Sequence, residues 1–151
     1  MPLGPLLWED TTKTVTRRIP DVADRGILAE VDFVGECKGA GRMAGMVARF
    51  TGTDRYWWDP AVNEVITGTA QSQLTFQSGE IVLFKATGIG NQVSFPSNAA
   101  LNVISLFNFI KPPNNLAWLR STLVLWEAYV DLKTQTSIGW AYEWVSPKPR
   151  S

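Results

Sequence analysis

The chain consists of short runs of β-branched and aromatic residues, separated by clusters of Gly, Pro, Asn and Ser. No long segment shows the 3.6-residue periodicity of an amphipathic helix, so strands are the expected elements. A chain of 151 residues, of which 45% are hydrophobic, is long and apolar enough to fold as one domain over residues 1–151. This pattern predicts an all-β fold.

Nine segments carry the strand pattern, and two of them flank Ala70 in a way that suggests one bent strand. Joining these two gives eight strands, the number at which a closed barrel has room for one small ligand. We therefore predict a closed antiparallel β-barrel of about eight strands. The predicted strands are Thr12–Arg18, Gly26–Val34, Arg42–Thr51, Val65–Thr69, Gln71–Gln77, Glu80–Gly88, Leu101–Phe109, Leu123–Asp131 and Ile138–Val145.

Two hairpins set the predicted inner face of the barrel. In the first, a two-residue turn at Ser78 and Gly79 joins the flanking strands. The face that is more apolar near this turn is expected to point inward. That face contains Ser72, Leu74, Phe76, Ile81, Leu83 and Lys85, and the opposite face contains Gln73, Thr75, Val82 and Phe84.

The second hairpin joins the last two strands, with Asp131 expected opposite Ile138. Three aromatic residues at period two then share a face with a carboxylate. We predict that this face lines the interior. Its members are Leu125, Glu127, Tyr129, Trp140, Tyr142 and Trp144.

The polar residues on these two faces are the candidate catalytic groups. Burial beside aromatic rings would raise the pKa of Glu127 and suit it to acid–base chemistry or ligand anchoring, although it could equally cap the rim or pair with an inward cation. Lys85 could polarise a ligand carbonyl, pair with Glu127, or extend to the barrel mouth. The hydroxyls of Tyr129 and Tyr142 could orient an oxygenated ligand or bond to the backbone.

The segment Asp54–Pro60 is expected to be a loop. Because two adjacent Trp residues in a loop rarely both enter one core, we expect Trp57 or Trp58 to cover a barrel mouth or an interface. A lid over a ligand and a contact in a homodimer are both consistent with this pattern.

Composition excludes several kinds of chemistry. The chain has no His and a single Cys, Cys37, so Ser-His or Cys-His nucleophile pairs and intrachain disulfides are excluded. No metal site and no cofactor are predicted.

Fourteen basic and fourteen acidic residues cancel, which predicts neither nucleic-acid nor membrane binding. The N-terminus lacks a basic flank and no Asn-x-Ser/Thr acceptor occurs, so a cytoplasmic location is expected.

Several short motifs resemble, in their order, a family of small lipocalin-like barrels of unknown function. The similarity runs from about Gly26 to Val145. The chain departs from the family at Gln71 and Ser72, where the family has an Arg-Tyr pair, so no role of that pair is carried over. The matching motifs are Gly41–Gly45, Asp54–Pro60, Leu74–Val82, Phe107–Phe109, Ala117–Arg120 and Trp140–Val145.

The resemblance implies a lipocalin- or calycin-like barrel, or one similar to allene oxide cyclase, and a possible reaction class. Some fungal barrels of this kind are pericyclases, including hetero-Diels–Alderases that join a tropolone-derived quinone methide to a terpene such as humulene. The expected function is therefore a cofactor-free cyclase that acts on an apolar polyketide or terpenoid in natural-product biosynthesis. A non-catalytic carrier, or an interaction module with a filled interior, are the alternatives.

In the cyclase hypothesis, the barrel holds two reacting partners in a near-attack arrangement. Tyr129, Tyr142 or Lys85 would donate a hydrogen bond to a substrate carbonyl, and Glu127 would orient that donor. The residues expected to bind the apolar substrate are Trp58, Leu83, Leu125, Trp140 and Trp144.

Overall fold

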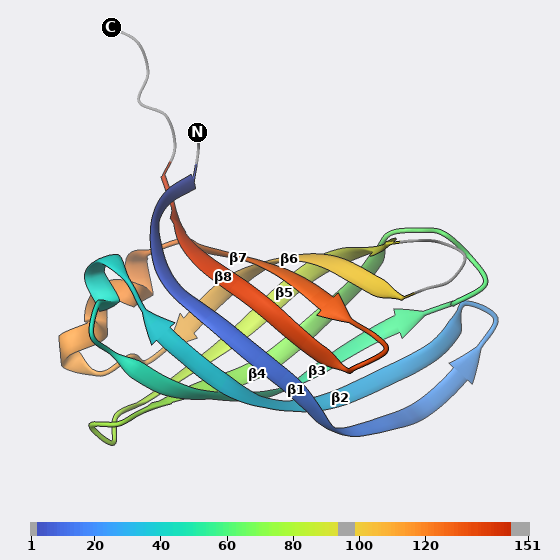
Figure 1. Cartoon of the computed structure of the whole chain (residues 1–151), viewed down its shortest axis with the longest axis horizontal. Helices are drawn as coiled ribbons and strands as arrows, with labels where there is room; N and C mark the ends of the chain where they lie inside the picture. Colours follow the sequence, from blue (N-terminus) through green and yellow to red (C-terminus); the bar gives the residue numbers. More distant parts are fainter. Residues whose placement is uncertain (1–2, 94–98, 146–151) are drawn as a thin grey trace, which may run out of the picture.

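The computed structural model describes residues 3–93 and 99–145, which form a closed antiparallel barrel of eight strands (Figure 1). Each strand pairs with the next in the chain, and β1 pairs with β8 to close the barrel. The predicted fold class is confirmed. The strands are β1 (Leu3–Ala23), β2 (Gly26–Gly39), β3 (Val47–Trp58), β4 (Ile66–Phe76), β5 (Ile81–Val93), β6 (Ala100–Ile110), β7 (Val124–Asp131) and β8 (Thr136–Trp144).

Two short 3-10 helices lie at one end of the barrel, η1 (Gly41–Met43) and η2 (Asn114–Ser121). They bury Met43, Leu116 and Leu119 against the interior of that end. Two proline residues directly before η2, whose rings fix φ, favour a chain break there. The motif Ala117–Arg120 is part of η2.

The interior of the helical end is filled by aromatic side chains. The ring of Phe84 lies 4.5 Å from that of Phe107 and 5.8 Å from that of Phe50, measured between centroids. Trp8 and Phe109 complete the cluster, at 6.3 Å from each other. The pairs are stacked, tilted or edge-on, and offset-stacked and edge-on arrangements are the ones that aromatic rings prefer. This half of the barrel is therefore a packed core.

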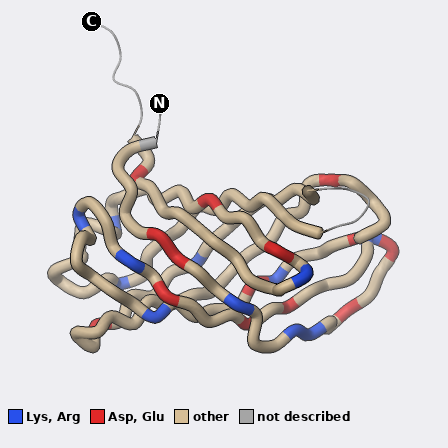
Figure 2. The backbone as a smooth tube through the Cα atoms, viewed as in Figure 1, with Lys and Arg blue, Asp and Glu red and all other residues tan. Residues whose placement is uncertain are grey.

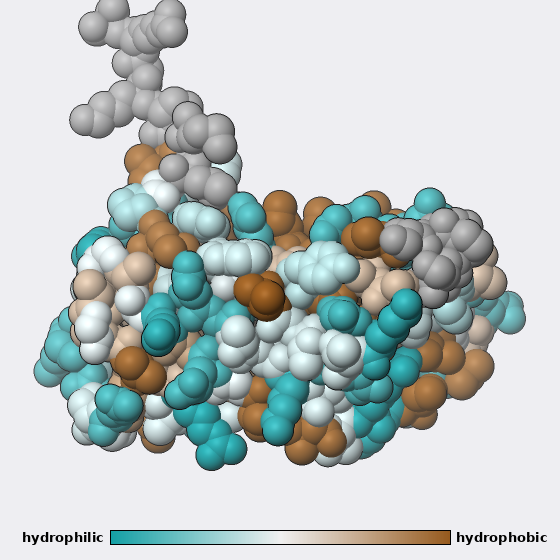
Figure 3. Space-filling view, in the orientation of Figure 1, coloured by the Kyte–Doolittle hydropathy of each residue, from teal (hydrophilic) through white to brown (hydrophobic). Residues whose placement is uncertain are grey.

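Residues of both charge signs are distributed along the strands (Figure 2). Apolar residues lie among hydrophilic ones on the face shown in Figure 3. On β1, Arg18 forms ion pairs with Glu30 at 2.9 Å and with Asp32 at 2.7 Å. Over the described ranges, no helix is long and apolar enough to cross a membrane.

The strand boundaries of β1 and β3 differ from those expected. β1 begins at Leu3, much earlier than Thr12, because its N-terminal half pairs with β8. β3 continues to Trp58, so the segment expected to be a loop is largely strand, and the residues expected to begin it, Arg42–Met46, belong to η1 and the turn that follows η1. The two segments around Ala70 form one strand, β4, as predicted.

The β4–β5 hairpin has a different register from the one predicted. Thr75 pairs with Ile81, so the connection is one residue longer than a two-residue turn allows. The N–H of Gly79 donates to the Phe76 carbonyl, and Gly79 takes a positive φ of 90°, which Gly adopts without steric cost. A shift of one residue exchanges the faces of one strand relative to the other.

The consequence is that β5 faces the opposite way from the prediction. Leu74 pairs with Val82, and both are buried together with Phe84. Leu83 and Lys85 instead lie on the outer wall, where Leu83 is 48% exposed. The inward assignment was correct for Ser72, Leu74 and Phe76 on β4 and wrong for Ile81, Leu83 and Lys85 on β5.

The predicted grouping of the β7–β8 face is confirmed, but its direction is wrong. Asp131 pairs with Thr136, two residues from the predicted partner, and a two-residue shift preserves the faces. Leu125 therefore lies opposite Tyr142, and Glu127 opposite Trp140. This face is on the outside of the barrel, since Tyr129 is 45% exposed.

Side-chain size explains why these aromatic rings face outward. The inward positions on β7 and β8 include Ala128, Gly139 and Ala141, which leave room for the ring of Trp126 and for the aromatic cluster opposite. A Cβ atom added at Gly139 would lie 2.4 Å from Nε1 of Trp126. A row of three further rings on the inner side would exceed the space in an eight-stranded barrel.

Candidate functional site

The half of the barrel away from the two 3-10 helices contains a cavity of about 460 Å³. Four aromatic rings form its floor and separate it from the packed half: Phe33, Phe50, Phe107 and Trp126. Phe33 and Phe50 are 5.0 Å apart, and Phe107 stacks on Trp126 at 5.8 Å. The floor is therefore apolar and closely packed.

The cavity walls consist mainly of small and apolar side chains. Because Gly and Ala occupy many inward positions of β4 and β5, the strands leave open space between them instead of filling it. Small hydroxyl side chains supply the polar part of the wall. The wall residues include Thr12, Thr14, Val31, Gly68, Ala70, Ser72, Ala86, Gly88, Gly90, Leu101, Val103, Ser105, Val130 and Ser137.

Strand β3 contributes an inward side chain at every second residue, from the floor to the far end of the cavity. Phe50 lies at the floor, Asp54 at mid-height, and Tyr56 and Trp58 follow toward the end where β3 joins β4. At Gly52 the absence of a side chain lets the Phe33 ring pack close to the strand, since a Cβ atom there would lie 2.8 Å from that ring. β3 thus places one carboxyl among apolar wall residues.

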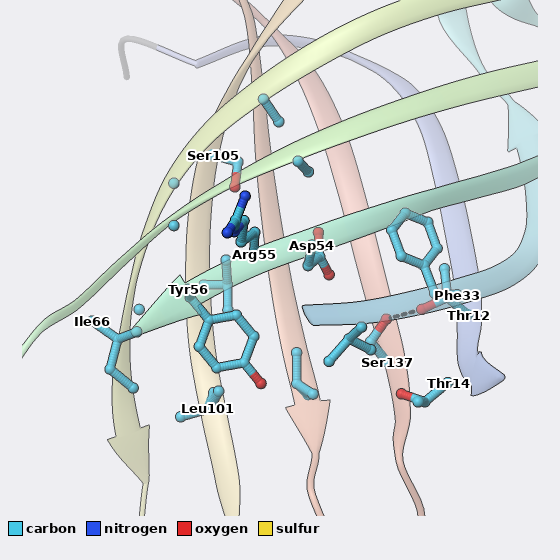
Figure 4. Close-up of a pocket in the computed structure, with 18 of the residues that line it drawn as sticks. Thr12, Thr14, Phe33, Asp54, Arg55, Tyr56, Ile66, Leu101, Ser105 and Ser137 are labelled. Atoms are coloured by element: carbon cyan, nitrogen blue, oxygen red, sulfur yellow. Dashed lines mark hydrogen bonds between the residues drawn. The ribbon is translucent and has the colours of Figure 1, made fainter. Parts of the chain in front are cut away.

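Asp54 is the central polar group of the cavity (Figure 4). It lies between Val31 on β2 and Ala70 on β4, which are its partners in the sheet. Within the described ranges, its carboxyl has no hydrogen-bond or ion-pair partner. Burial without a partner raises the pKa of Asp54 from 3.8 to about 7, because the charged form loses its hydration.

The end of the cavity beyond Asp54 has a different character. A register shift between Thr14 and Thr16 of β1 brings Arg17 opposite Val31, so that its guanidinium lies 5.7 Å from the centre of the Trp58 ring. Tyr56 lies nearby, and burial raises the pKa of its phenol. The Nε1 atom of Trp58 is buried and has no acceptor in the described part of the chain.

A second buried carboxyl, Asp10, lies beneath the cavity floor. Its Oδ2 accepts hydrogen bonds from the indole N–H of Trp8 at 2.9 Å and of Trp126 at 2.8 Å. Asp10 is 2% exposed, and burial outweighs these two bonds and raises its pKa to about 6. This carboxyl fixes the ring of Trp126 in the floor.

One of the nine residues selected from the sequence lines the cavity, namely Trp58. The structure brings Leu125, Glu127, Tyr129, Trp140 and Tyr142 together on the outer wall of β7 and β8. Desolvation raises the pKa of the Tyr142 phenol, and the charge of nearby Glu127 adds to this rise. Trp144 is 37% exposed near the chain end, and Leu83 and Lys85 lie on the outer wall of β5.

The expected placement of Glu127, Tyr129, Tyr142 and Lys85 inside the barrel is therefore wrong. The adjacent residues Trp57 and Trp58 also differ from the loop arrangement expected for them. Strand alternation turns Trp58 into the cavity and Trp57 outward, where the Arg25 guanidinium lies 4.0 Å from its ring.

Sequence reasoning missed Asp54, Tyr56 and Asp10. A signal for the first two was present: from Phe50 to Trp58, every second residue is Phe, Gly, Asp, Tyr and Trp, which is a strand pattern with one carboxyl on the apolar face. The assignment of this segment to a loop hid the pattern. Asp10 had no comparable signal, because its two indole partners are distant in sequence or on its own strand.

Comparison with known proteins gives no family for this chain. No family model matches the sequence. No curated protein matches it either. In the described part of the chain, no group of three or more His, Cys, Asp or Glu side chains could hold a metal ion.

Solved structures share the fold across nearly the whole chain. A conserved protein of unknown function from Rhodopseudomonas palustris is 17% identical with a TM-score of 0.73, covering 91% of this chain and 95% of that one. A protein of unknown function from Clostridium acetobutylicum is 11% identical with a TM-score of 0.76, covering 92% and 96%. A β-barrel-like protein from Acinetobacter baumannii is 14% identical with a TM-score of 0.69, covering 93% and 94%. At these identities the likeness is one of fold.

Proposed function

We propose that the barrel binds one apolar small molecule in the cavity above the aromatic floor. The cavity itself supports this proposal: about 460 Å³ of space inside a barrel whose other half is densely packed. Ligand sites in proteins occupy about 300–1,000 Å³ and combine apolar walls with a few polar groups. The lining has this composition, with Asp54 and a few hydroxyls among apolar side chains.

The test uses neutral apolar probes and a pair of neighbouring variants. Isothermal titration calorimetry would measure binding of adamantylmethanol, naphthylmethanol and a sesquiterpene alcohol. Ala86→Phe fills the cavity, whereas Thr87→Phe adds the same ring to the outer wall one residue away. We expect Ala86→Phe to lose at least about tenfold in affinity, since its ring occupies the ligand volume.

The same experiment defines what would contradict the proposal. Binding that is equal in Ala86→Phe and Thr87→Phe would place the ligand elsewhere on the molecule. Failure of every probe to bind the unmodified protein would indicate that the cavity is not a binding site. Unfolding curves of both variants show whether each one is folded.

A cofactor-free cyclase is a second candidate function, and one observation favours it. Asp54 is a carboxyl with a pKa of about 7 that faces a cavity with apolar walls, so a large share of it carries a proton at neutral pH. A protonated carboxyl in such a site can donate a hydrogen bond to a substrate carbonyl and stabilise charge that develops there. Asp54 would then take the donor role first assigned to Tyr129, Tyr142 or Lys85.

The cyclase proposal is tested by product formation. The protein would be incubated with an ortho-quinone methide and humulene, and the cycloadduct measured by mass spectrometry against the uncatalysed reaction. Asp54→Leu, which keeps a side chain of similar size but has no hydrogen-bond donor, should lower the rate by about 10²–10³, the cost of removing one such donor. A rate that matches the uncatalysed reaction, or one that Asp54→Leu leaves unchanged, would leave binding alone as the function.

A further inference from the structure

An apolar ligand alone does not explain why the interior of the barrel contains a carboxyl without a cationic partner. Two carboxyls, Asp10 and Asp54, lie inside, and neither has a cationic partner among the described residues. The Oδ2 atom of Asp10 accepts hydrogen bonds from two indole N–H groups, whereas its Oδ1 atom has no hydrogen-bond partner in the described part of the chain. Asp54 has no such donors and faces the cavity.

A lone buried carboxyl is costly, which makes its presence informative. Burial of an ionisable group without a partner opposes folding at any pH at which the group is charged. If the ligand required only a neutral hydrogen bond, a hydroxyl such as those of Ser72 and Ser105 in the same wall would provide it at lower cost. A carboxyl adds something that a hydroxyl cannot provide, namely a full negative charge.

The surroundings of Asp54 suit a cation that brings an apolar body with it. The floor rings of Phe33, Phe50, Phe107 and Trp126 lie on one side of Asp54 along the cavity. The faces of aromatic rings attract ammonium groups, and this attraction is stronger where water is excluded. A hydrocarbon skeleton attached to the nitrogen would contact the same rings and the small wall residues.

We infer that the ligand is an apolar amine, whose protonated nitrogen pairs with the carboxyl of Asp54 while its hydrocarbon body lies on the aromatic floor. This inference rests on the proposed binding function and names the class of ligand. The two arginine side chains nearest the cavity do not occupy the position proposed for the amine nitrogen. Arg17 is exposed and is held over the Trp58 ring, and Arg55 reaches Glu30 outside the barrel at 3.8 Å.

The experiment compares three probes that share one skeleton: adamantylmethylamine, adamantylmethanol and adamantanecarboxylate. Calorimetry at pH 8 would measure all three with the unmodified protein, Asp54→Asn and Glu127→Gln. Glu127→Gln is the matched control, because it neutralises a carboxyl on the outer wall. We expect the amine to bind about 10- to 100-fold more tightly than the alcohol, the ratio typical of a charge-assisted hydrogen bond.

The variants separate the effect of the Asp54 charge on affinity from the effect of the cavity shape. Asp54→Asn should remove the preference for the amine and leave the affinity for the alcohol within about twofold, because Asn keeps the shape of the side chain. Glu127→Gln should retain the preference. The carboxylate should bind most weakly of the three to the unmodified protein, since two like charges would lie together in a site of low dielectric.

The pH dependence of binding gives an independent readout. The groups that face Asp54 from its neighbours in the sheet, Val31 and Ala70, are apolar. Among the described residues, the other ionisable residues that line the cavity are Arg17, Arg55 and Tyr56, and Asp10 lies beneath its floor beside the thiol of Cys37. The amine stays protonated up to about pH 10. Its affinity should therefore rise by up to about tenfold per unit below pH 7 and level off above it, and Asp54→Asn should flatten this rise.

Each outcome has a distinct meaning. If the alcohol binds and the amine gains nothing over it, or if Asp54→Asn retains the preference for the amine, the assignment of an amine ligand is wrong and the binding function stands. If none of the three probes binds the unmodified protein, the binding function fails as well. An affinity for the alcohol that falls as pH rises through 7 would instead support the protonated-donor role of Asp54 described for the cyclase.

Discussion

The carboxyl of Asp10 accepts a hydrogen bond of 2.8 Å from the indole N–H of Trp126, across 116 residues of chain. The same oxygen accepts the indole N–H of Trp8. The pair connects the closure of the barrel, where β1 meets β8 and β7 lies next to it, to the floor of the cavity. Because Trp126 stacks on Phe107, the position of its ring sets the depth of the ligand space.

Loss of the Asp10 carboxyl should destabilise the fold. Asp10→Ala leaves two buried indole N–H groups without an acceptor, at about 1–3 kcal/mol each. Asp10→Asn retains an oxygen in the same place and is expected to lose less than Asp10→Ala. Urea unfolding, followed by tryptophan fluorescence, measures both free energies. Equal stability of Asp10→Ala and the unmodified protein would show that the two indole bonds contribute nothing net.

Stability should fall as pH rises from about 4 to 7. In the folded chain, Asp54 and Asp10 keep their protons up to about pH 7 and 6, whereas in the unfolded chain they lose them near the ordinary value of 3.8. The folded state therefore holds more protons in this window, and its free energy of unfolding decreases as they dissociate, by up to roughly 1.4 kcal/mol per pH unit for each group. Above pH 7 the decline should end.

Substitution isolates the contribution of Asp54 to this profile. Asp54→Asn should reduce the slope between pH 5 and 7 and be at least as stable as the unmodified protein at pH 8, because it removes a buried charge. Asp24→Asn, in the exposed β1–β2 turn, should leave the slope unchanged. Asp32, whose pKa is lowered to about 2 by hydrogen bonds from Arg18, titrates below the window. A flat or rising profile in the unmodified protein contradicts the prediction.

Neutral substitutions on the outer wall of β5, β7 and β8 should not affect ligand binding. Glu127→Gln, Tyr142→Phe and Lys85→Met change side chains that do not line the cavity. The affinity for adamantylmethanol should stay within about twofold in each, compared with the loss expected for Ala86→Phe. A tenfold loss in any of the three would place the functional surface outside the barrel.

Addition of a methyl group at Gly139 should displace the Trp126 ring, which is part of the cavity floor. In Gly139→Ala, the added Cβ atom would lie 2.4 Å from Nε1 of Trp126 and 2.7 Å from Oδ1 of Asp10, so both must move. We expect a loss of about 1–3 kcal/mol in the free energy of unfolding, as for other overpacked positions. A shift in tryptophan emission should accompany it.

The neighbouring residue provides the control for this test. Ile138→Ala shortens a side chain on the outer wall and should change stability by roughly 0.5 kcal/mol or less. If Gly139→Ala were as stable as Ile138→Ala, the contact between Trp126 and β8 would be looser than the structure indicates.

The sequence by itself determined the fold class. Alternating β-branched and aromatic residues between turn residues predict eight strands, because this alternation is a local property of each strand. The same alternation grouped Leu125, Glu127 and Tyr129 on one face of β7, with Trp140 and Tyr142 on the same face of β8, as the structure confirms.

Only the tertiary structure decided which face of each strand points inward. One additional residue in the β4–β5 connection exchanges the faces of β5, and one register shift in β1 brings Arg17 to the cavity. On β7 and β8, the limited interior volume selects Ala128, Gly139 and Ala141 for the inside and leaves the larger rings outside. These outcomes depend on how eight strands share one enclosed space, so no single segment could specify that Asp54 faces a cavity.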